Sequence, residues 1–284
     1  MVHFQARAAC GRNRLRGRIG KGVPQVGRFR HPPTSSVVII PARAASRRLP
    51  RKLLLRKTGK SVLEHTYQAA LSARRPLGVY VAAGDEEIVR EVHRFGGQVE
   101  MTDPALPSGT DRVAELARRS AFRQFDIFVN VQGDEPEIAP TAIDTLIECL
   151  QNNPTATMAT LATPIRDENR WRDPACVKVV CDTAGRALYF SRAAIPHIRD
   201  AEGSGPENLP QPPLAHIGLY AYRREALLRF ATLPPSPLEQ IERLEQLRAL
   251  EAGLSIAVAL VDEATCGIDT EADYERFVAR HKSA

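Results

Sequence analysis

Short hydrophobic runs alternate with longer amphipathic stretches along the first half of the chain. Val37–Ile40 is a β-branched run followed by Pro41, a pattern typical of a parallel strand buried on both faces. Ser61 is a favourable N-cap for a helix that follows it. The same patterns predict strands at Val79–Ala82, Gln98–Met101 and Asp126–Val131, and helices at Val62–Leu71, Glu86–Phe95 and Asp111–Ser120. This alternation indicates βαβ units and a mostly parallel sheet.

From Met158 onward the pattern changes, because strand-like runs follow one another with fewer helices between them. These runs are Met158–Pro164, Cys176–Cys181, Ala187–Phe190, His216–Tyr222 and Ser255–Leu260. We therefore expect an α/β fold with a Rossmann-like core, a mixed but mostly parallel sheet, and a smaller antiparallel elaboration over about residues 158–255.

Two helices and one loop complete the predicted order of elements. Apolar residues at helical spacing predict a single amphipathic helix over Leu238–Ala252. A closing helix is expected over Thr270–His281. The Gly- and Pro-rich segment 200–213 is typical of a surface loop or a mobile lid.

Length and composition favour one large domain without a membrane span. The chain has 284 residues, of which 43% are hydrophobic, enough for one extended α/β core. No stretch approaches the roughly 20 apolar residues that cross a bilayer. The five cysteines form no CxxC pair, which favours reduced thiols in a cytoplasmic protein over a zinc site or a disulfide framework.

Basic residues are concentrated at the N-terminus. Residues 1–36 hold eight Lys and Arg side chains and no acid, while the whole chain has a net charge of +6, so residues 37–284 carry −2. The charge of this main domain argues against nucleic-acid binding. Residues 1–36 are compatible with an organelle transit peptide, a disordered basic arm, or a leader upstream of a start near Val37. We expect a disordered extension over 1–36 and a single domain over 37–284.

A basic loop follows the first predicted strand. Ligands of open α/β sheets bind at the carboxyl ends of the strands, and Arg43, Arg48 and Lys52 would supply positive charge there. Small residues such as Ala42 would let the backbone approach phosphates. The loop matches neither the Walker A nor the GxGxxG pattern, so it is either a different phosphate-binding loop or a solvated surface segment.

Two acidic residues follow predicted strands and precede predicted helices. Asp134 lies in the segment Asn130–Pro136, and Asp269 lies in Gly267–Thr270. Each is compatible with a Mg²⁺ ligand beside a nucleoside triphosphate. Each is equally compatible with a helix cap or a solvated turn, and their spacing in the sequence leaves both interpretations open.

Seven segments, in this order, resemble the 3-deoxy-manno-octulosonate cytidylyltransferase (CMP-Kdo synthetase) family. They extend from residue 37 almost to the C-terminus and are Val37–Lys52, Pro107–Arg112, Asn130–Pro136, Leu188–Pro196, His216–Arg223, Leu244–Arg248 and Gly267–Thr270. The resemblance implies a nucleotidyltransferase (GT-A-like) fold and a cytoplasmic homodimer. It also implies Mg²⁺-dependent transfer of CMP from CTP to the acidic sugar 3-deoxy-D-manno-octulosonate (Kdo), with release of pyrophosphate, for lipopolysaccharide biosynthesis.

The resemblance also assigns candidate site residues. Asp134 and Asp269 would hold Mg²⁺, while Arg43 and Lys52 would take part in catalysis beside them. The nucleotide site would comprise Ala42, Arg43, Arg48, Lys52, Ser108, Gly109, Thr110, Arg112 and Gln132. The sugar site would comprise Arg192, His216, Tyr220, Glu245 and Gln246, with Glu239 as a further candidate.

The nucleotide loop departs from the family pattern at several positions. Arg51 stands where the family usually has glycine, and Ala44 stands where it usually has an aromatic residue. A related acidic sugar, 8-amino-Kdo or sialate, is therefore an alternative acceptor. A non-catalytic nucleotide-binding homologue is a second alternative, although Lys52, Asp134 and Asp269 are all retained. No membrane or nucleic-acid partner is expected.

Overall fold

The computed structural model describes residues 34–46, 48–199, 206, 209, 211–262 and 267–282. The expected basic extension lies outside these residues except for its last three positions, and much of the expected loop 200–213 lies outside them as well.

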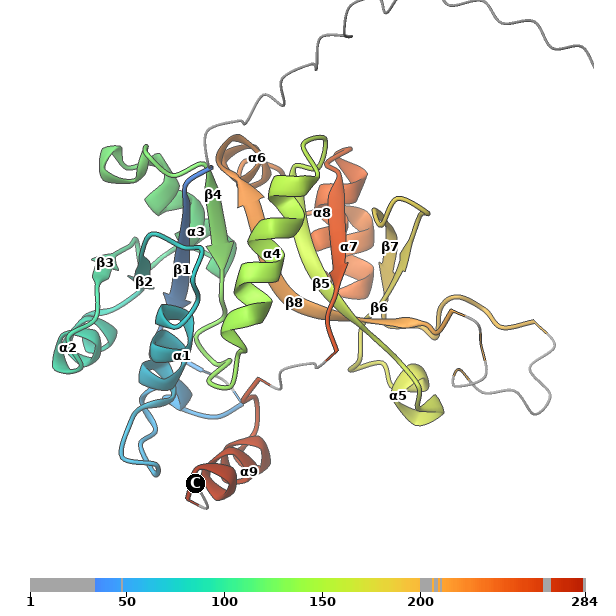
Figure 1. The fold of residues 1–284 in the computed structure, drawn as a ribbon. Helices are drawn as coiled ribbons and strands as arrows, with labels where there is room; N and C mark the ends of the chain where they lie inside the picture. Colours follow the sequence, from blue (N-terminus) through green and yellow to red (C-terminus); the bar gives the residue numbers. More distant parts are fainter. Residues whose placement is uncertain are drawn as a thin grey trace, which may run out of the picture. The chain divides into compact units, whose positions relative to one another are not determined.

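The described strands form one mixed sheet in the order β3-β2-β1-β4-β8-β5-β9, with β6 and β7 attached beside β8. Within that order only β8 runs against the other strands, since it is antiparallel to both β4 and β5. The expectation of a mixed, mostly parallel sheet is therefore confirmed (Figure 1). The strands are β1 Ser36–Ala42, β2 Val79–Ala83, β3 Val99–Met101, β4 Ile127–Asn130, β5 Met158–Pro164, β6 Lys178–Cys181, β7 Ala187–Ser191, β8 Leu214–Arg223 and β9 Ile256–Leu260.

Helices cover both faces of this sheet (Figure 1). Residues of α1, α2, α4 and α9 pack into one core, while residues of α3, α6 and α8 pack into the other. Strand β1 contributes to both cores, because Val38 and Ile40 face the first and Val37 and Ile39 the second. The helices are α1 Val62–Leu71, α2 Glu86–Arg94, α3 Gly109–Arg118, α4 Pro140–Asn152, α5 Glu168–Arg172, α6 Arg224–Phe230, α7 Pro237–Glu242, α8 Gln246–Glu251 and α9 Glu271–Lys282. Each helix within the described residues is too short or too polar to span a bilayer.

Side-chain caps fix where the helices near the carboxyl edge of the sheet begin. Ser61, Asp85 and Ser108 accept hydrogen bonds from backbone N–H groups in the first turns of α1, α2 and α3. Because Ser108 is the cap, α3 begins at Gly109, two residues earlier than predicted. The loops before these helices are therefore held at defined positions beside the strand ends.

The predicted single helix over Leu238–Ala252 is wrong. The chain breaks at Arg243, whose left-handed conformation (φ 55°, ψ 47°) separates α7 from α8. The break reorients the second half, so that Leu247 is fully buried, whereas Ile241 is 77% exposed. The apolar residues of α8 are buried as the spacing predicts, but those of α7 and α8 do not form one continuous buried face.

Candidate active site

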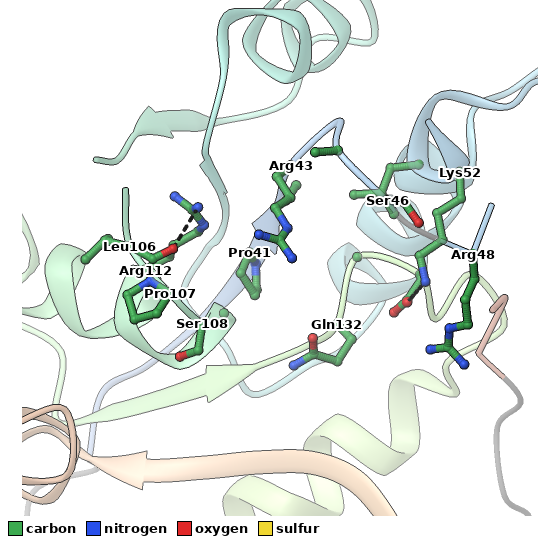
Figure 2. Close-up of a pocket in the computed structure, with 16 residues that line it drawn as sticks. Pro41, Arg43, Ser46, Arg48, Lys52, Leu106, Pro107, Ser108, Arg112 and Gln132 are labelled. Atoms are coloured by element: carbon green, nitrogen blue, oxygen red, sulfur yellow. Dashed lines mark hydrogen bonds and ion pairs between the residues drawn. The ribbon is translucent and has the colours of Figure 1, made fainter. Parts of the chain in front are cut away.

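A cavity of about 370 Å³ lies at the carboxyl ends of β1 and β4 (Figure 2). Its size is within the usual range for small-molecule sites. It brings together most of the residues expected at a nucleotide site, contributed by three loops: Ala42, Arg43, Arg48, Lys52, Ser108, Gly109, Arg112, Gln132 and Asp134. The cations of the basic loop thus line this cavity, as a phosphate-binding loop requires.

The basic loop is anchored by Asp85. Its Oδ2 accepts a hydrogen bond from the backbone N–H of Ala44 at 2.7 Å, while its Oδ1 caps α2. Further along, Arg51 adopts a left-handed conformation (φ 55°, ψ 29°) and its guanidinium pairs with Glu87. Glycine adopts this left-handed conformation more easily than other residues, which explains why the family usually has glycine at position 51. The turn leads directly into a short 3₁₀ helix that begins at Lys52.

Lys52 joins the two candidate metal-binding carboxylates. Its Nζ donates to Oδ2 of Asp134, to Oδ1 of Asp269 at 3.1 Å and to the backbone carbonyl of Ile268 at 2.9 Å. Arg48 also donates to Oδ1 of Asp269 at 2.7 Å. A backbone hydrogen bond from Ile268 to the carbonyl of Asp134 at 2.8 Å holds the two segments together. Three elements that lie far apart in the sequence therefore converge at one edge of the cavity.

Neither aspartate serves as a helix cap. The N-cap of α4 is Ala139, without a side-chain hydrogen bond, so Asp134 does not cap that helix. At the start of α9 it is the hydroxyl of Thr270 that accepts from the backbone N–H of Asp273. The carboxylate of Asp269 instead contacts the two cations Arg48 and Lys52.

Asp134 and Asp269 fit Mg²⁺, which needs few protein ligands, better than a metal ion that is coordinated entirely by protein side chains. Among the described residues there is no group of three or more His, Cys, Asp and Glu side chains that could hold a metal ion. Mg²⁺ commonly takes one or two carboxylates and completes its shell with water and substrate phosphates. Asp134 and Asp269 already converge on a single cation, the ammonium of Lys52, so their donor set fits such an ion.

Two glycines let the walls of the cavity approach one another. A Cβ on Gly109 would lie 3.1 Å from Cγ of Pro41, and a Cβ on Gly133 would lie 3.2 Å from the Pro41 carbonyl oxygen. Both distances are shorter than ordinary van der Waals contact. The glycines are therefore needed for the close approach of the 108–109 and 132–134 segments to the end of β1.

Arg112 supports the cavity wall through the segment 102–106. Its guanidinium is largely buried and donates to the hydroxyl of Thr102 at 3.1 Å and to the carbonyls of Asp103 (2.8 Å), Pro104 and Leu106 (both 3.3 Å). Burial lowers the pKa of Arg112, and the nearby charge of Arg43 lowers it further. The contacts within the protein thus make Arg112 a residue that positions the loop.

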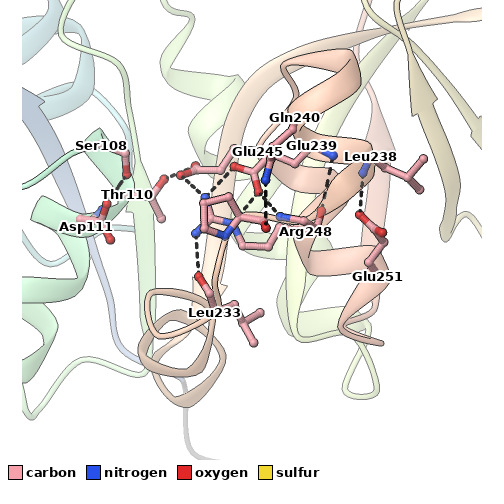
Figure 3. A network of polar contacts seen from close by, with 12 residues as sticks. Ser108, Thr110, Asp111, Leu233, Leu238, Glu239, Gln240, Glu245, Arg248 and Glu251 are labelled. Atoms are coloured by element: carbon pink, nitrogen blue, oxygen red, sulfur yellow. Dashed lines mark hydrogen bonds and ion pairs between the residues drawn. The ribbon is translucent and has the colours of Figure 1, made fainter.

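Thr110 does not line the cavity but faces the region expected to bind the sugar (Figure 3). Its hydroxyl donates to Oε2 of Glu245 at 2.7 Å. Burial raises the pKa of Glu245, which the hydrogen bond from Thr110 opposes. The carboxylate of Glu239 is used differently, since it completes a capping box with Ser236 and pairs in bidentate fashion with Arg248 at 2.7 and 2.8 Å. These contacts leave Glu239 outside the candidate site.

A second cavity, of about 440 Å³, is lined by Glu135, whose neighbour in the chain, Asp134, lines the first. Three of the expected sugar-site residues, His216, Tyr220 and Gln246, line this second cavity. Arg192 does not: its guanidinium donates to the carbonyl of Glu242 at 2.8 Å and to that of Pro174 at 3.0 Å.

The polar groups of the second cavity are neutral along β8. Nε2 of His216 lies 2.9 Å from the hydroxyl of Thr160, and its ring contacts Phe190 edge-on at 5.0 Å. Burial lowers the pKa of His216 to about 3, so the ring is neutral at physiological pH. The hydroxyl of Tyr220 is buried and has no hydrogen-bond partner within the described part of the chain. Its hydrogen-bonding capacity is therefore unused within the described residues.

Comparison with known proteins gives the family. The cytidylyltransferase family model matches residues 37–256. The 3-deoxy-manno-octulosonate cytidylyltransferase of Rhodopirellula baltica is 51% identical over 248 residues, which are 87% of this chain and 98% of that protein. This chain belongs to the same family. The protein of that name from Syntrophotalea carbinolica is 44% identical over 86% of this chain and 98% of its own length.

A solved structure confirms the family's fold over the same part of the chain. CMP:2-keto-3-deoxy-manno-octonic acid synthetase complexed with CTP superimposes with a TM-score of 0.81 at 39% identity, covering 88% of this chain and 99% of that one. A 4-diphosphocytidyl-2C-methyl-D-erythritol synthase from Anaerococcus prevotii shares only the fold, at a TM-score of 0.57 and 13% identity. The predicted family and the nucleotidyltransferase architecture are both confirmed.

Several residues that line the two cavities were not predicted from the sequence. Ser46 lies in the basic loop and Glu135 in the segment Asn130–Pro136, but neither residue was assigned a role. Arg170 lines the second cavity from the short helix α5, which was not predicted. Its position in a charged, aperiodic stretch gives no signal of a binding residue in the sequence.

Proposed function

We propose that this protein transfers CMP from CTP to Kdo, forming CMP-Kdo and pyrophosphate for lipopolysaccharide biosynthesis. The observation that carries the proposal is the convergence of Lys52, Asp134 and Asp269 at the edge of the first cavity. The names of its relatives and the CTP complex of its structural neighbour support both substrates.

The first cavity is suited to a nucleoside triphosphate. Arg43, Arg48 and Lys52 concentrate positive charge along one wall, where they would bind the phosphates and stabilise the departing pyrophosphate. Ser108 and Gln132 also line this cavity and offer a hydroxyl and an amide, with which they would contact the cytidine. The side chain of Lys52 is only 14% exposed, so its charge is weakly screened by solvent.

The second cavity would place the acceptor sugar beside the phosphates. Its anomeric hydroxyl would attack the α-phosphorus in line with the departing pyrophosphate, a reaction that depends on positioning and charge stabilisation. His216, Tyr220 and Gln246 would orient the sugar through its hydroxyl groups. Glu245, which lines neither cavity but directly precedes Gln246 and is anchored by Thr110, would hold a further hydroxyl of the sugar.

We also propose that Asp134 and Asp269 hold Mg²⁺ during the reaction. When bound, the ion would neutralise phosphate charge and polarise the attacking hydroxyl. A homodimer in the cytoplasm is the further expectation that family membership supports.

Pyrophosphate release tests this function directly. Each of the four nucleoside triphosphates is incubated with Kdo, 8-amino-Kdo or sialate, with and without Mg²⁺. We expect release from CTP with Kdo in the presence of Mg²⁺ and little from the other combinations. Faster release with 8-amino-Kdo or sialate would reassign the acceptor, and no release from CTP with any of the three sugars would refute the enzyme hypothesis.

A further inference from the structure

The second cavity needs a cation if it is to hold an acidic sugar. Within the described residues, the charged side chains that line it are Glu135 and Arg170. The neutral imidazole of His216 cannot balance a carboxylate. Arg170 is therefore the cation that the cavity itself presents to a ligand.

Two other cations near this cavity are already used within the protein. The guanidinium of Arg192 donates to the carbonyls of Glu242 and Pro174 and does not line the cavity. The buried ammonium of Lys178 donates to three backbone carbonyls, those of Asp173, Cys176 and Arg192. Turning Arg192 to a ligand would break both of its hydrogen bonds, and turning the fully buried Lys178 would break three, which is costly.

Arg170 has no such commitment. Its backbone N–H donates to Asp167, the N-cap of α5, at 3.0 Å, but its guanidinium makes no hydrogen bond or ion pair to any residue that the structure describes. The nearby carboxylate of Glu168 is taken by Arg172. Trp171 is 5% exposed and donates to the carbonyl of Ile195 at 3.1 Å, so it anchors α5 while the exposed Arg170 lines the cavity.

We propose that Arg170 binds the carboxylate of the acceptor sugar and so selects an acidic sugar, an inference that rests on the proposed function. A guanidinium matches a carboxylate with two parallel N–H···O hydrogen bonds. The sugar's acidic end then lies on the Arg170 side of the cavity. The unpartnered hydroxyl of Tyr220 and the amide of Gln246 then face its neutral hydroxyl groups.

Steady-state kinetics of Arg170→Ala with CTP and Kdo test this assignment. Loss of a charge-assisted pair corresponds to roughly a ten- to hundredfold rise in KM for Kdo, with KM for CTP unchanged. Arg170→Lys keeps the positive charge but loses the planar pair of N–H donors. Its KM for Kdo is expected to lie between those of the wild type and Arg170→Ala. Arg172→Ala is the matched control, because that side chain lies on the same helix, pairs with Glu168 and stacks on Trp171.

A second measurement uses Kdo amide, in which the carboxylate is neutral. The wild-type protein should strongly prefer Kdo over the amide, and Arg170→Ala should lose that preference. An unchanged KM and preference in Arg170→Ala, or a selective loss in Arg192→Ala instead, would overturn the assignment. If Arg170→Ala does not fold, Arg170→Gln provides the same comparison. Wild-type turnover of CTP and Kdo is measured alongside, and its absence would refute the proposed function rather than the role of Arg170.

Discussion

Thr110 donates a hydrogen bond from its hydroxyl to Oε2 of Glu245 at 2.7 Å, across 135 residues of sequence (Figure 3). Thr110 lies in the first turn of α3, directly after residues that line the first cavity. Glu245 directly precedes Gln246, which lines the second cavity. This hydrogen bond therefore connects a segment beside the proposed nucleotide site to a segment beside the proposed sugar site.

Replacing Thr110 by valine should impair use of the sugar most strongly at acidic pH. Burial already raises the pKa of Glu245, and the Thr110 hydroxyl is the first of the contacts that lower it. Without that donor the pKa rises further, so the carboxylate is protonated at a higher pH. We expect kcat/KM for Kdo to fall roughly tenfold at pH 6 and its acidic limb to move to higher pH.

The matched control is Thr110→Ser, which keeps the hydroxyl and should retain the wild-type pH profile. The measurement is kcat/KM for Kdo and for CTP between pH 5 and pH 9. If the acidic limb of the kcat/KM profile lies at the same pH in Thr110→Val as in the wild type, protonation of Glu245 does not limit the reaction.

Asp134→Asn and Asp269→Asn should each lower kcat by roughly 100-fold or more, since metal-assisted charge stabilisation contributes several kcal/mol. Both carboxylates contact Lys52 in a partly exposed position, so folding should be little affected. The assay is turnover against Mg²⁺ concentration, together with thermal unfolding.

Glu271→Gln is the control for these two variants. Glu271 lies close in sequence to Asp269 but, within the described part of the chain, pairs with Lys57, and both side chains are more than half exposed. Its rate and Mg²⁺ dependence should equal those of the wild type. A near-normal rate in either aspartate variant would remove that residue from the proposed metal site.

The local signals in the sequence predicted the first half of the fold well. β-branched runs and Ser or Asp caps act over a few residues, so the strand at Val37–Ile40 and the helix after Ser61 could be read directly. The break at Arg243 could not, because nothing in an apolar repeat marks a single left-handed residue. Leu244 and Leu247, which follow Arg243, are buried in the core, and such tertiary contacts override local helix propensity.

The candidate site was predicted less evenly. Residues that follow strands in the parallel core gather at one edge of the sheet, which explains why Lys52 and Asp134 were found together. Whether an arginine faces a cavity or the backbone depends on contacts formed only in the folded chain. Arg112 and Arg192 donate hydrogen bonds to backbone carbonyls. Arg170, which lies in a stretch without a recognisable motif, lines the second cavity.

Arg112→Met should destabilise the protein and weaken use of CTP. Methionine keeps much of the volume but removes the donors to the carbonyls of Asp103, Pro104 and Leu106. Losing these hydrogen bonds should lower the free energy of unfolding by about 2–3 kcal/mol in total. KM for CTP should rise because the same segment lines the first cavity.

Arg112→Lys separates charge from geometry in this prediction. A lysine keeps the positive charge but cannot reproduce the planar set of donors, so it should recover little of the lost stability. Chemical denaturation and CTP kinetics are measured on both variants. A fully stable Arg112→Lys would show that charge alone supports the loop.

Arg243→Pro should destabilise the α7–α8 region and impair use of the sugar. Proline fixes φ near −65°, whereas Arg243 has φ 55°, and it also removes the N–H that donates to the carbonyl of Glu239. We expect a loss of about 3 kcal/mol in the free energy of unfolding and a raised KM for Kdo, because Glu245 and Gln246 follow the break. Arg243→Gly accepts the left-handed conformation and should stay within about 1 kcal/mol of the wild type. Equal stability of the two variants would mean that the break between the helices is not required.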